Sequence, residues 1–286
     1  MSKIITHPGS AHLDDFLSIC LVIEKYGNID EINRREPTEE EIKDPSIWKL
    51  DVGEKNDPNI RCYDHHQGLR YDCTLSLLLK EWKLWKKAKR VHEWLSIVVA
   101  NDAIGPKEVT KILKVSFTAL IRLDSFVERT ILDLFKREKV IKKEDMLFSL
   151  MKSIGQNFFT YIGGYYTSLK EVEKNAEYKK IKGVQIIKCI DNVEHSSMLV
   201  RILNEKKRKK WENQRGGIAI YPNKRVPGTI ALRRYEDDKR VDFSRISNYD
   251  KVVFAHPKGF FISLEPMPDS ELDRYIGDAI KKKEKR

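Results

Sequence analysis

Several features that would define a class of protein are missing from this sequence of 286 residues. Its four cysteines, Cys20, Cys62, Cys73 and Cys189, are scattered without C-x-x-C pairs, which argues against a disulfide framework and a structural zinc site. No apolar run approaches the roughly 20 residues that are needed to cross a bilayer. The first residues show no signal-peptide or transit-peptide pattern. We therefore expect a soluble, cytoplasmic protein.

The chain has more basic than acidic residues. Lysine and arginine total 54 against 43 acidic residues, which gives a formal net charge of +11. Such a surplus favours polyanionic partners, namely nucleic acid, nucleotides or phosphorylated small molecules. An alternative of equal weight is that a highly charged surface simply keeps the protein soluble.

The first hundred residues alternate short apolar runs with helical patterns. This alternation predicts an N-terminal three-layer α/β domain with a parallel sheet. A hydrophobic content of 41% is enough for a sizeable core. The strands of this sheet are expected at residues 4–6, 29–33, 47–52 and 60–63.

A long helical stretch should follow to about residue 180, with breaks near Gly105-Pro106, at Lys139 to Lys143 and near Gly163-Gly164. The remaining residues again read as strands and predict a smaller, mixed α/β domain, including a helix at about 196–211. We therefore divide the chain into residues 1–180, which include a helical connector, and residues 181–286. The later strands are expected at 184–190, 217–221, 229–235, 251–255 and 260–264.

Histidines and aspartates gather in four patches of the first domain. The first three patches each follow a predicted strand, and the carboxyl ends of parallel strands open on one crevice. Side chains that are far apart in sequence can therefore meet there. The patches are His7–Asp15, with the sequence HPGSAHLDD; Asp51; Asp64-His65-His66; and Asn101-Asp102.

Imidazoles mixed with carboxylates suit Mn²⁺, Mg²⁺ or Fe²⁺ better than a structural zinc. One ion rarely needs three histidines and three or more aspartates, whereas a pair of ions about 3.5–4 Å apart does. Simpler interpretations exist for single residues. Asp14 and Asp15 can cap a helix, Asp51 before Gly53 can form a turn, and a lone His12 can be structural.

Three motifs carry a resemblance to a known family. The sequences THPGSAHLDD (residues 6–15), LDVGE (50–54) and YDHHQ (63–67) resemble the Asp-His-His (DHH) phosphoesterase superfamily, and more narrowly its melanocyte-proliferating-gene, or Myg-type, branch. The stretch VVFAHPKGFF at 252–261 is similar to the same branch. The superfamily includes RecJ-type exonucleases, oligoribonucleases and family II inorganic pyrophosphatases.

The resemblance implies two divalent ions, Mn²⁺ first, with Mg²⁺ or another ion as an alternative. The implied ligands form two groups that share one bridging carboxylate. His7 and His12 would hold one ion, Asp14, His65 and Asp102 the other, and Asp51 would bridge them.

The resemblance also implies the remaining catalytic and substrate-binding roles. His66 would face the substrate phosphate or the leaving group, and Asp64 would orient a neighbouring histidine. Asp15 is left as the helix cap. Residues 1–180 would be the catalytic domain and residues 181–286 the substrate-binding domain. In the second domain His256 and Lys258 would contact the substrate, with Arg233 or Arg234 as further candidates.

We therefore expect a metal-dependent phosphoesterase that cleaves phosphodiester bonds, as an exonuclease on single-stranded RNA or DNA or on short oligonucleotides. An alternative keeps the site but takes a small phosphate, as a phosphatase, a pyrophosphatase or a cyclic-dinucleotide phosphodiesterase. Two rivals of another kind are a one-zinc deacetylase and a nucleic-acid-binding protein without activity.

Overall fold

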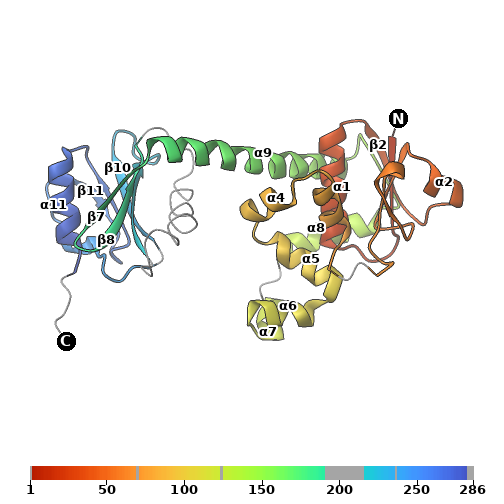
Figure 1. The fold of residues 1–286 in the computed structure, drawn as a ribbon, viewed down its shortest axis with the longest axis horizontal. Helices are drawn as coiled ribbons and strands as arrows, with labels where there is room; N and C mark the ends of the chain where they lie inside the picture. The colour runs from red at the N-terminus through yellow and green to blue at the C-terminus, as the bar shows by residue number, and fades with distance from the viewer. Residues whose placement is uncertain (1, 69–70, 123–124, 191–215, 236, 282–286) are drawn as a thin grey trace. The chain divides into compact units, whose positions relative to one another are not determined.

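A computed structural model describes residues 2–68, 71–122, 125–190, 216–235 and 237–281 (Figure 1). The chain divides into two compact units, Met1–Gly163 and Gly164–Arg286. This division falls inside a long helix, whereas the sequence placed it after residue 180. The α/β fold class expected from the sequence is confirmed, with a mostly parallel first sheet and a smaller, mixed second unit.

Unit 1 is built on a six-stranded sheet of order β4-β5-β3-β1-β2-β6. Its four central strands run parallel to one another, and the two edge strands are antiparallel to their neighbours. The strands are β1 (Ser2–Thr6), β2 (Ile29–Arg34), β3 (Ile47–Leu50), β4 (Asn56–Asp57), β5 (Cys62–Tyr63) and β6 (Val140–Lys142).

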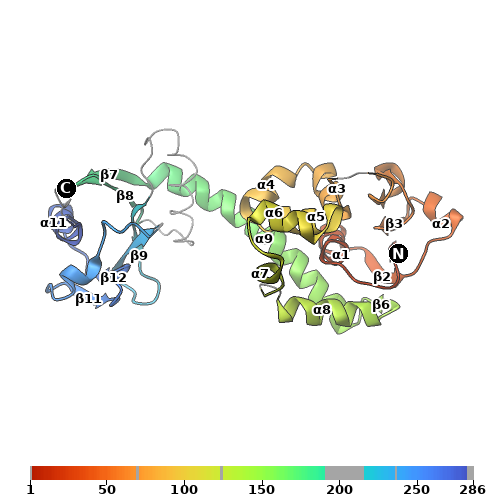
Figure 2. The ribbon, with the colours of Figure 1, turned by 90° about the horizontal axis from the view of Figure 1, so that it is seen from below.

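Helices cover both faces of this sheet unequally. The short α2 (Glu39–Lys43) lies on one face, while α1 (Leu13–Tyr26) and the later helices lie on the other (Figures 1 and 2). The third layer is therefore thin. The later helices are α3 (Thr74–Glu81), α4 (Trp85–Val91), α5 (Leu95–Ile104), α6 (Pro106–Leu113), α7 (Phe117–Arg122) and α8 (Phe126–Arg137).

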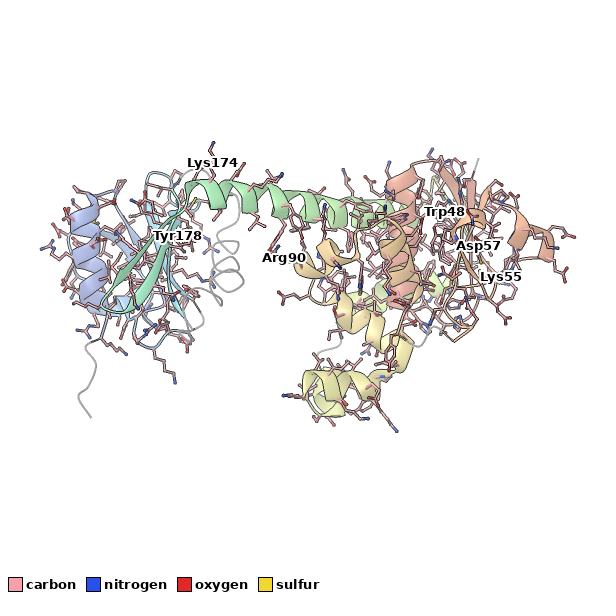
Figure 3. All side chains as sticks on the ribbon, viewed as in Figure 1. Trp48, Lys55, Asp57, Arg90, Lys174 and Tyr178 are labelled. Carbon is pink, nitrogen blue, oxygen red and sulfur yellow. The ribbon has the colours of Figure 1, made fainter. Side chains whose placement is uncertain are left out.

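Helix α1 is the centre of unit 1. Every residue from Asp14 to Ile23 is buried, because α1 packs against β3 on one side and against α3, α5 and α8 elsewhere. The helix ends at Gly27, whose φ of 68° suits the left-handed cap. Trp48 of the sheet, labelled in Figure 3, is also almost fully buried and stacks on Tyr63.

Helix α9 (Met146–Asn175) continues without interruption through Gly163 and Gly164, so the break expected there is wrong. Each glycine costs about 1 kcal/mol in a helix, which 30 helical residues can bear. The break expected at Lys139 to Lys143 is confirmed, because α8 ends at Arg137, α9 begins at Met146, and β6 lies between them. A second short strand, β7, begins before the end of the stretch that was predicted to be helical. β6 forms because it pairs with the edge of β2, a long-range contact that local pattern does not reveal. Among the described residues, no helix is long and apolar enough to cross a membrane.

Unit 2 contains a second six-stranded sheet, of order β11-β12-β10-β9-β8-β7. All neighbours are antiparallel except β8 and β9. Helix α11 (Asp269–Ala279) and a 3₁₀ turn (Phe243–Ile246) contribute to the apolar core on this sheet. The helix expected at 196–211 lies outside the described residues. The strands are β7 (Glu177–Ile181), β8 (Val184–Lys188), β9 (Gly217–Pro222), β10 (Ile230–Tyr235), β11 (Val252–Ala255) and β12 (Phe261–Leu264).

The contact between α1 and α9 yields a first prediction. A Cβ atom at Gly155 would lie 2.2 Å from the carbonyl oxygen of Cys20, whereas one at Gly163 would meet nothing within 4 Å. Gly155→Ala should therefore force the helices apart and lower the free energy of unfolding by about 1–3 kcal/mol. Gly163→Ala, in the same helix, should raise it by about 0.5–1 kcal/mol. Urea unfolding followed by circular dichroism would measure both, and equal effects would contradict this packing.

Candidate metal centre

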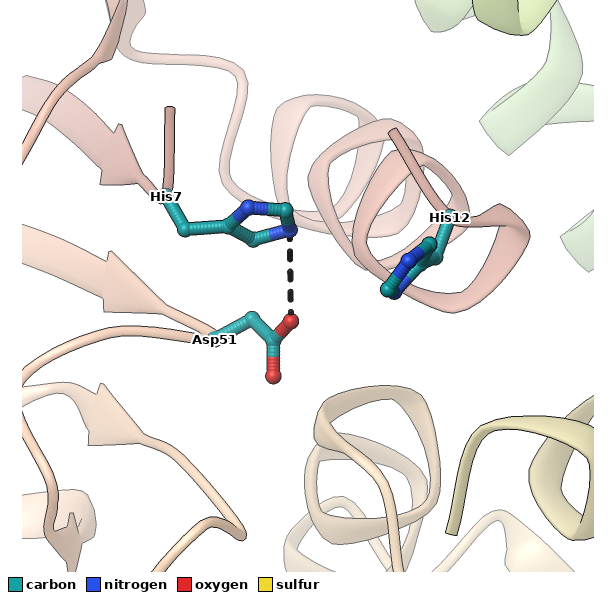
Figure 4. A group of neighbouring side chains, drawn as sticks. All are labelled: His7, His12 and Asp51. Carbon is teal, nitrogen blue, oxygen red and sulfur yellow. Dashed lines mark ion pairs between the residues drawn. The ribbon is translucent and has the colours of Figure 1, made fainter. Parts of the chain in front are cut away.

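The carboxyl ends of the parallel strands bring the predicted patches together. His7 directly follows β1, Asp51 follows β3, and the Asp64-His65-His66 segment follows β5. His12 precedes α1, and Asp102 comes from α5. Figure 4 shows the rings of His7 and His12 and the carboxylate of Asp51 around one common space. The geometry expected from the sequence pattern therefore exists in the fold.

Close contacts link imidazole nitrogens to carboxylate oxygens throughout this cluster. His65 Nε2 lies 3.3 Å from Asp51 and 3.0 Å from Asp102, so this ring links the two carboxylates. Further pairs include His7 Nε2 with Asp51 Oδ2 at 3.5 Å and His12 Nδ1 with Asp102 Oδ1 at 3.4 Å.

The side chains of six predicted residues form overlapping sets of possible metal ligands, with His66 as a seventh member. Within each set the ligand atoms lie within 4.8 Å of one another. Asp51 and His12 each belong to two sets, so neighbouring sites would share ligands. The sets are His7, His12 and Asp51; Asp51, His65 and His66; and His12, Asp14 and Asp102.

The donor atoms also fit divalent ions. Both carboxylate oxygens of Asp14 are buried and have no hydrogen-bond partner among the described residues. Burying polar atoms without partners costs free energy that coordination to a metal would recover. Mixed nitrogen and oxygen donors, with no cysteine among them, match the preferences of Mn²⁺ or Mg²⁺.

Electrostatics in the cluster are dominated by carboxylates that face one another. Burial raises the pKa of Asp14 well above its usual range, and the nearby Asp102 and Asp51 raise it further. Burial alone would lower the pKa of His65, but its contacts with Asp102 and Asp51 outweigh this and raise it to about 10. The cluster thus favours positive charge in its midst, whether a proton or a metal ion supplies it.

Asp51 occupies an unusual backbone position. Its φ is 60°, which is uncommon for a residue other than glycine, and its side chain is almost completely buried. The hydroxyl of Thr74, at the start of α3, lies 3.0 Å from Asp51 Oδ1 and 3.1 Å from the carbonyl oxygen of Tyr63. The turn and this hydroxyl together orient the carboxylate towards the histidines.

Asp15 does more than cap the helix. Its Oδ1 accepts hydrogen bonds from the backbone N–H groups of His12 and Phe16, at 3.0 and 2.6 Å. Its Oδ2 lies 3.0 Å from His7 Nε2, and this contact raises the pKa of His7 to about 9. Asp15 therefore positions His7 as well as the first turn of α1.

Asp64 lies against His66. Its Oδ1 is 2.6 Å from the ring nitrogen Nδ1 and also accepts the backbone N–H of His66. Its other oxygen accepts the N–H of Glu54 at 2.7 Å. The His66 side chain is 59% exposed, so Nε2 is the ring atom that can meet a substrate.

Sequence reasoning overlooked Arg34, at the end of β2. Its buried guanidinium donates to the carbonyl of Phe135 at 3.1 Å and to that of Ser10 at 2.9 Å. It also reaches the carbonyls of His7 and Gly9, at 3.3 and 3.4 Å. An arginine at the end of a strand predicts nothing by itself, because only the fold shows that the loop between His7 and His12 wraps around it.

The predicted substrate contacts lie in unit 2, around the start of β12. Arg233 is exposed and pairs with Phe261 in the β10–β12 register. Arg234 donates from its guanidinium to the carbonyl of Val241 at 2.9 Å and pairs with Asp237, so it stabilises its own loop. His256 is half-buried and accepts the backbone N–H of the exposed Lys258 at 3.1 Å. The roles of these four residues stay predictions.

Residues 3–77 match the family model MYG1_exonuc, described as "Uncharacterised protein family (UPF0160)". The matched segment contains the first three motifs, from His7 to His66. The predicted resemblance is therefore confirmed for this part of the chain. No curated protein matches the sequence significantly.

Solved structures similar to this chain share little sequence with it. One is a DHH domain described as a member of the s1p family of ribosomal proteins, with 10% identity, coverage of 96% of this chain and 85% of the other, and a TM-score of 0.34. A Methanococcus jannaschii protein, provisionally assigned as a family II inorganic pyrophosphatase, has 12% identity, coverage of 96% of this chain and 99% of the other, and a TM-score of 0.24. An uncharacterized protein from Helicobacter pylori G27 has 12% identity, coverage of 97% and 99%, and a TM-score of 0.22. TM-scores in this range do not establish a common fold.

The contact between Thr74 and Asp51 can be tested directly. Thr74→Val keeps the shape of the side chain but removes the hydroxyl, and partners of metal-binding side chains typically contribute about 10- to 100-fold to affinity. We expect at least about tenfold weaker Mn²⁺ binding by calorimetry. Thr74→Ser, which restores the hydroxyl, should bind nearly as the original protein does. Unchanged binding by the valine variant would show that Asp51 needs no such support.

Proposed function

We propose that this protein is a metal-dependent phosphoesterase that uses two divalent ions, with Mn²⁺ as the first candidate. One observation carries the proposal: side chains from separate segments converge into ligand sets that overlap at Asp51 and at His12. The predicted ligands among them are His7, His12, Asp14, Asp51, His65 and Asp102. The match of residues 3–77 to MYG1_exonuc supports it. The four cysteines are free and buried, which fits the cytoplasmic location that we propose.

When bound, a pair of divalent ions lowers the pKa of a water molecule and neutralises charge on phosphate oxygens. His7 and His12 would hold one ion, and Asp14, His65 and Asp102 the other. Asp51 lies within reach of both groups and is the shared ligand in our assignment.

His66 and Asp64 are the pair that we assign to the substrate. Asp64 accepts a hydrogen bond from Nδ1–H of the ring, which leaves Nε2 on the exposed edge of His66. In the doubly protonated ring, Nε2–H would donate a hydrogen bond to a phosphate oxygen or a proton to a leaving group. Since Asp64 is itself fixed by the N–H of Glu54, the ring is held in one orientation before any substrate arrives.

The substrate that we favour is single-stranded RNA or DNA, or a short oligonucleotide, cleaved from one end. The net charge of +11 supports a polyanionic substrate. Arg233, His256 and Lys258 of unit 2 are proposed contacts for it, whereas the bonded guanidinium of Arg234 suits a structural role better. A small phosphate compound is the alternative substrate for the same site.

The bridging role of Asp51 is tested by Asp51→Asn. Losing one carboxylate charge that both ions share should lower Mn²⁺-supported turnover by at least about a hundredfold, while the circular dichroism spectrum stays unchanged. Asp133→Asn removes the same charge from an exposed residue of α8 that belongs to none of the ligand sets, and it should retain full activity. Substantial turnover by the Asp51 variant would rule out the shared-ligand assignment.

Metal content and substrate class need a separate measurement. Elemental analysis should find about two Mn²⁺-type ions per chain, whereas a single zinc would favour the deacetylase. A 5′-labelled oligonucleotide with Mn²⁺ should release mononucleotides, and EDTA should stop the reaction. Phosphate release from pyrophosphate alone would replace the nuclease by a small-phosphate enzyme. Binding of the oligonucleotide without cleavage would indicate a protein without activity.

A further inference from the structure

A cavity of about 820 Å³ opens beside the metal centre and lies entirely within unit 1. His12, Asp14 and Asp102 form part of its wall, so the cavity and the ligand sets share these three side chains. Residues of α5, α6, α7 and α8 complete it. If a substrate phosphate lies at the metal centre, the part of the substrate attached to that phosphate would therefore lie at the entrance to this cavity.

Beyond the metal ligands the wall is largely apolar. Leucine, isoleucine and valine side chains make up most of it, and none of the described residues that line it is a lysine or an arginine. Glu128 is the one lining acid in the described chain apart from the ligands. A second phosphate group would be repelled there or left without a partner, whereas an uncharged, apolar group would be accommodated.

Two aromatic rings in the wall are accessible. Trp94, just before α5, is 42% exposed, and Phe117, at the start of α7, is 50% exposed. Large apolar side chains left open beside a cavity usually mark a binding surface. Flat rings bind other flat rings by stacking, which is how proteins hold unpaired bases. Asn101, next to Asp102 on α5, adds an amide that can hydrogen-bond to the polar edge of a base.

We propose that this cavity is the subsite for a nucleobase of the substrate, stacked against Trp94 or Phe117 while the attached phosphate lies at the metal centre. This inference rests on the proposed phosphoesterase function and narrows its substrate to nucleotides. The volume of the cavity lies within the range of about 300–1,000 Å³ that is usual for small-molecule pockets. Pyrophosphate and polyphosphate have no uncharged or aromatic group that could occupy this cavity.

The test compares Trp94→Ala and Phe117→Ala with Phe126→Ala. Phe126 is 80% exposed on the neighbouring α8 and does not line the cavity, so it is a matched control. With thymidine 5′-(4-nitrophenyl phosphate) and Mn²⁺, the KM of at least one cavity variant should rise about tenfold, as expected for the loss of one stacking partner, with a smaller change in kcat. The control should behave as the original protein does.

A second measurement separates this inference from the proposed function. Titration of the EDTA-treated protein with thymidine, which carries the base but no phosphate to be repelled by the metal-free carboxylates, reports by calorimetry on the cavity without any turnover. Affinity reduced about tenfold in either cavity variant, but not in Phe126→Ala, supports the subsite even if no phosphoesterase activity is found. Equal affinities and equal KM values in all three variants overturn the subsite while leaving the phosphoesterase proposal standing.

Discussion

Mutual repulsion between buried aspartates is the main electrostatic constraint on the structure of unit 1. Asp14, Asp15 and Asp51 are nearly inaccessible to solvent, and Asp102 faces them from α5. Carboxylates this close and this buried cannot all remain ionised unless positive charge lies between them. The histidines supply part of that charge when protonated, and divalent ions would supply it more completely. Burying several carboxylates together lowers the stability of the fold. A cluster of this kind therefore indicates a functional role and not a structural one.

The scaffold holds this arrangement from outside the ligand sets. Arg34 donates hydrogen bonds to carbonyls of the loop that carries His7 and to the carbonyl of Phe135, the one buried residue of α8. Asp15 fixes His7, Thr74 fixes Asp51, and Asp64 fixes His66. His7 and Asp51 are thus each oriented by a side chain from another element, and His66 is oriented by a neighbour in its own segment.

The metal centre and the neighbouring cavity differ sharply in character. One side gathers carboxylates and imidazoles, and the other offers aliphatic side chains with two accessible aromatic rings. A ligand that suits both must be charged at one end and apolar or aromatic at the other. A nucleotide has this division, with its phosphate and base separated by a sugar. The proposed function and the proposed subsite therefore describe two ends of the same molecule.

The sequence alone was sufficient to predict the class of fold and the identity of the clustered residues. The period of its apolar runs predicted strands β1, β2, β3 and β5, and the residue types following them predicted a metal centre. The prediction was wrong at Gly163-Gly164, which continues a helix instead of ending it. The break expected at Lys139 to Lys143 is there, but the sequence did not show that this segment becomes strand β6 by pairing with β2. Only the tertiary structure revealed Arg34, Thr74 and the apolar cavity, because their roles depend on which distant backbone and side chains they meet. The local pattern of residue types determines which secondary structure a segment prefers. The contacts that orient the side chains of a site form only when distant segments pack together.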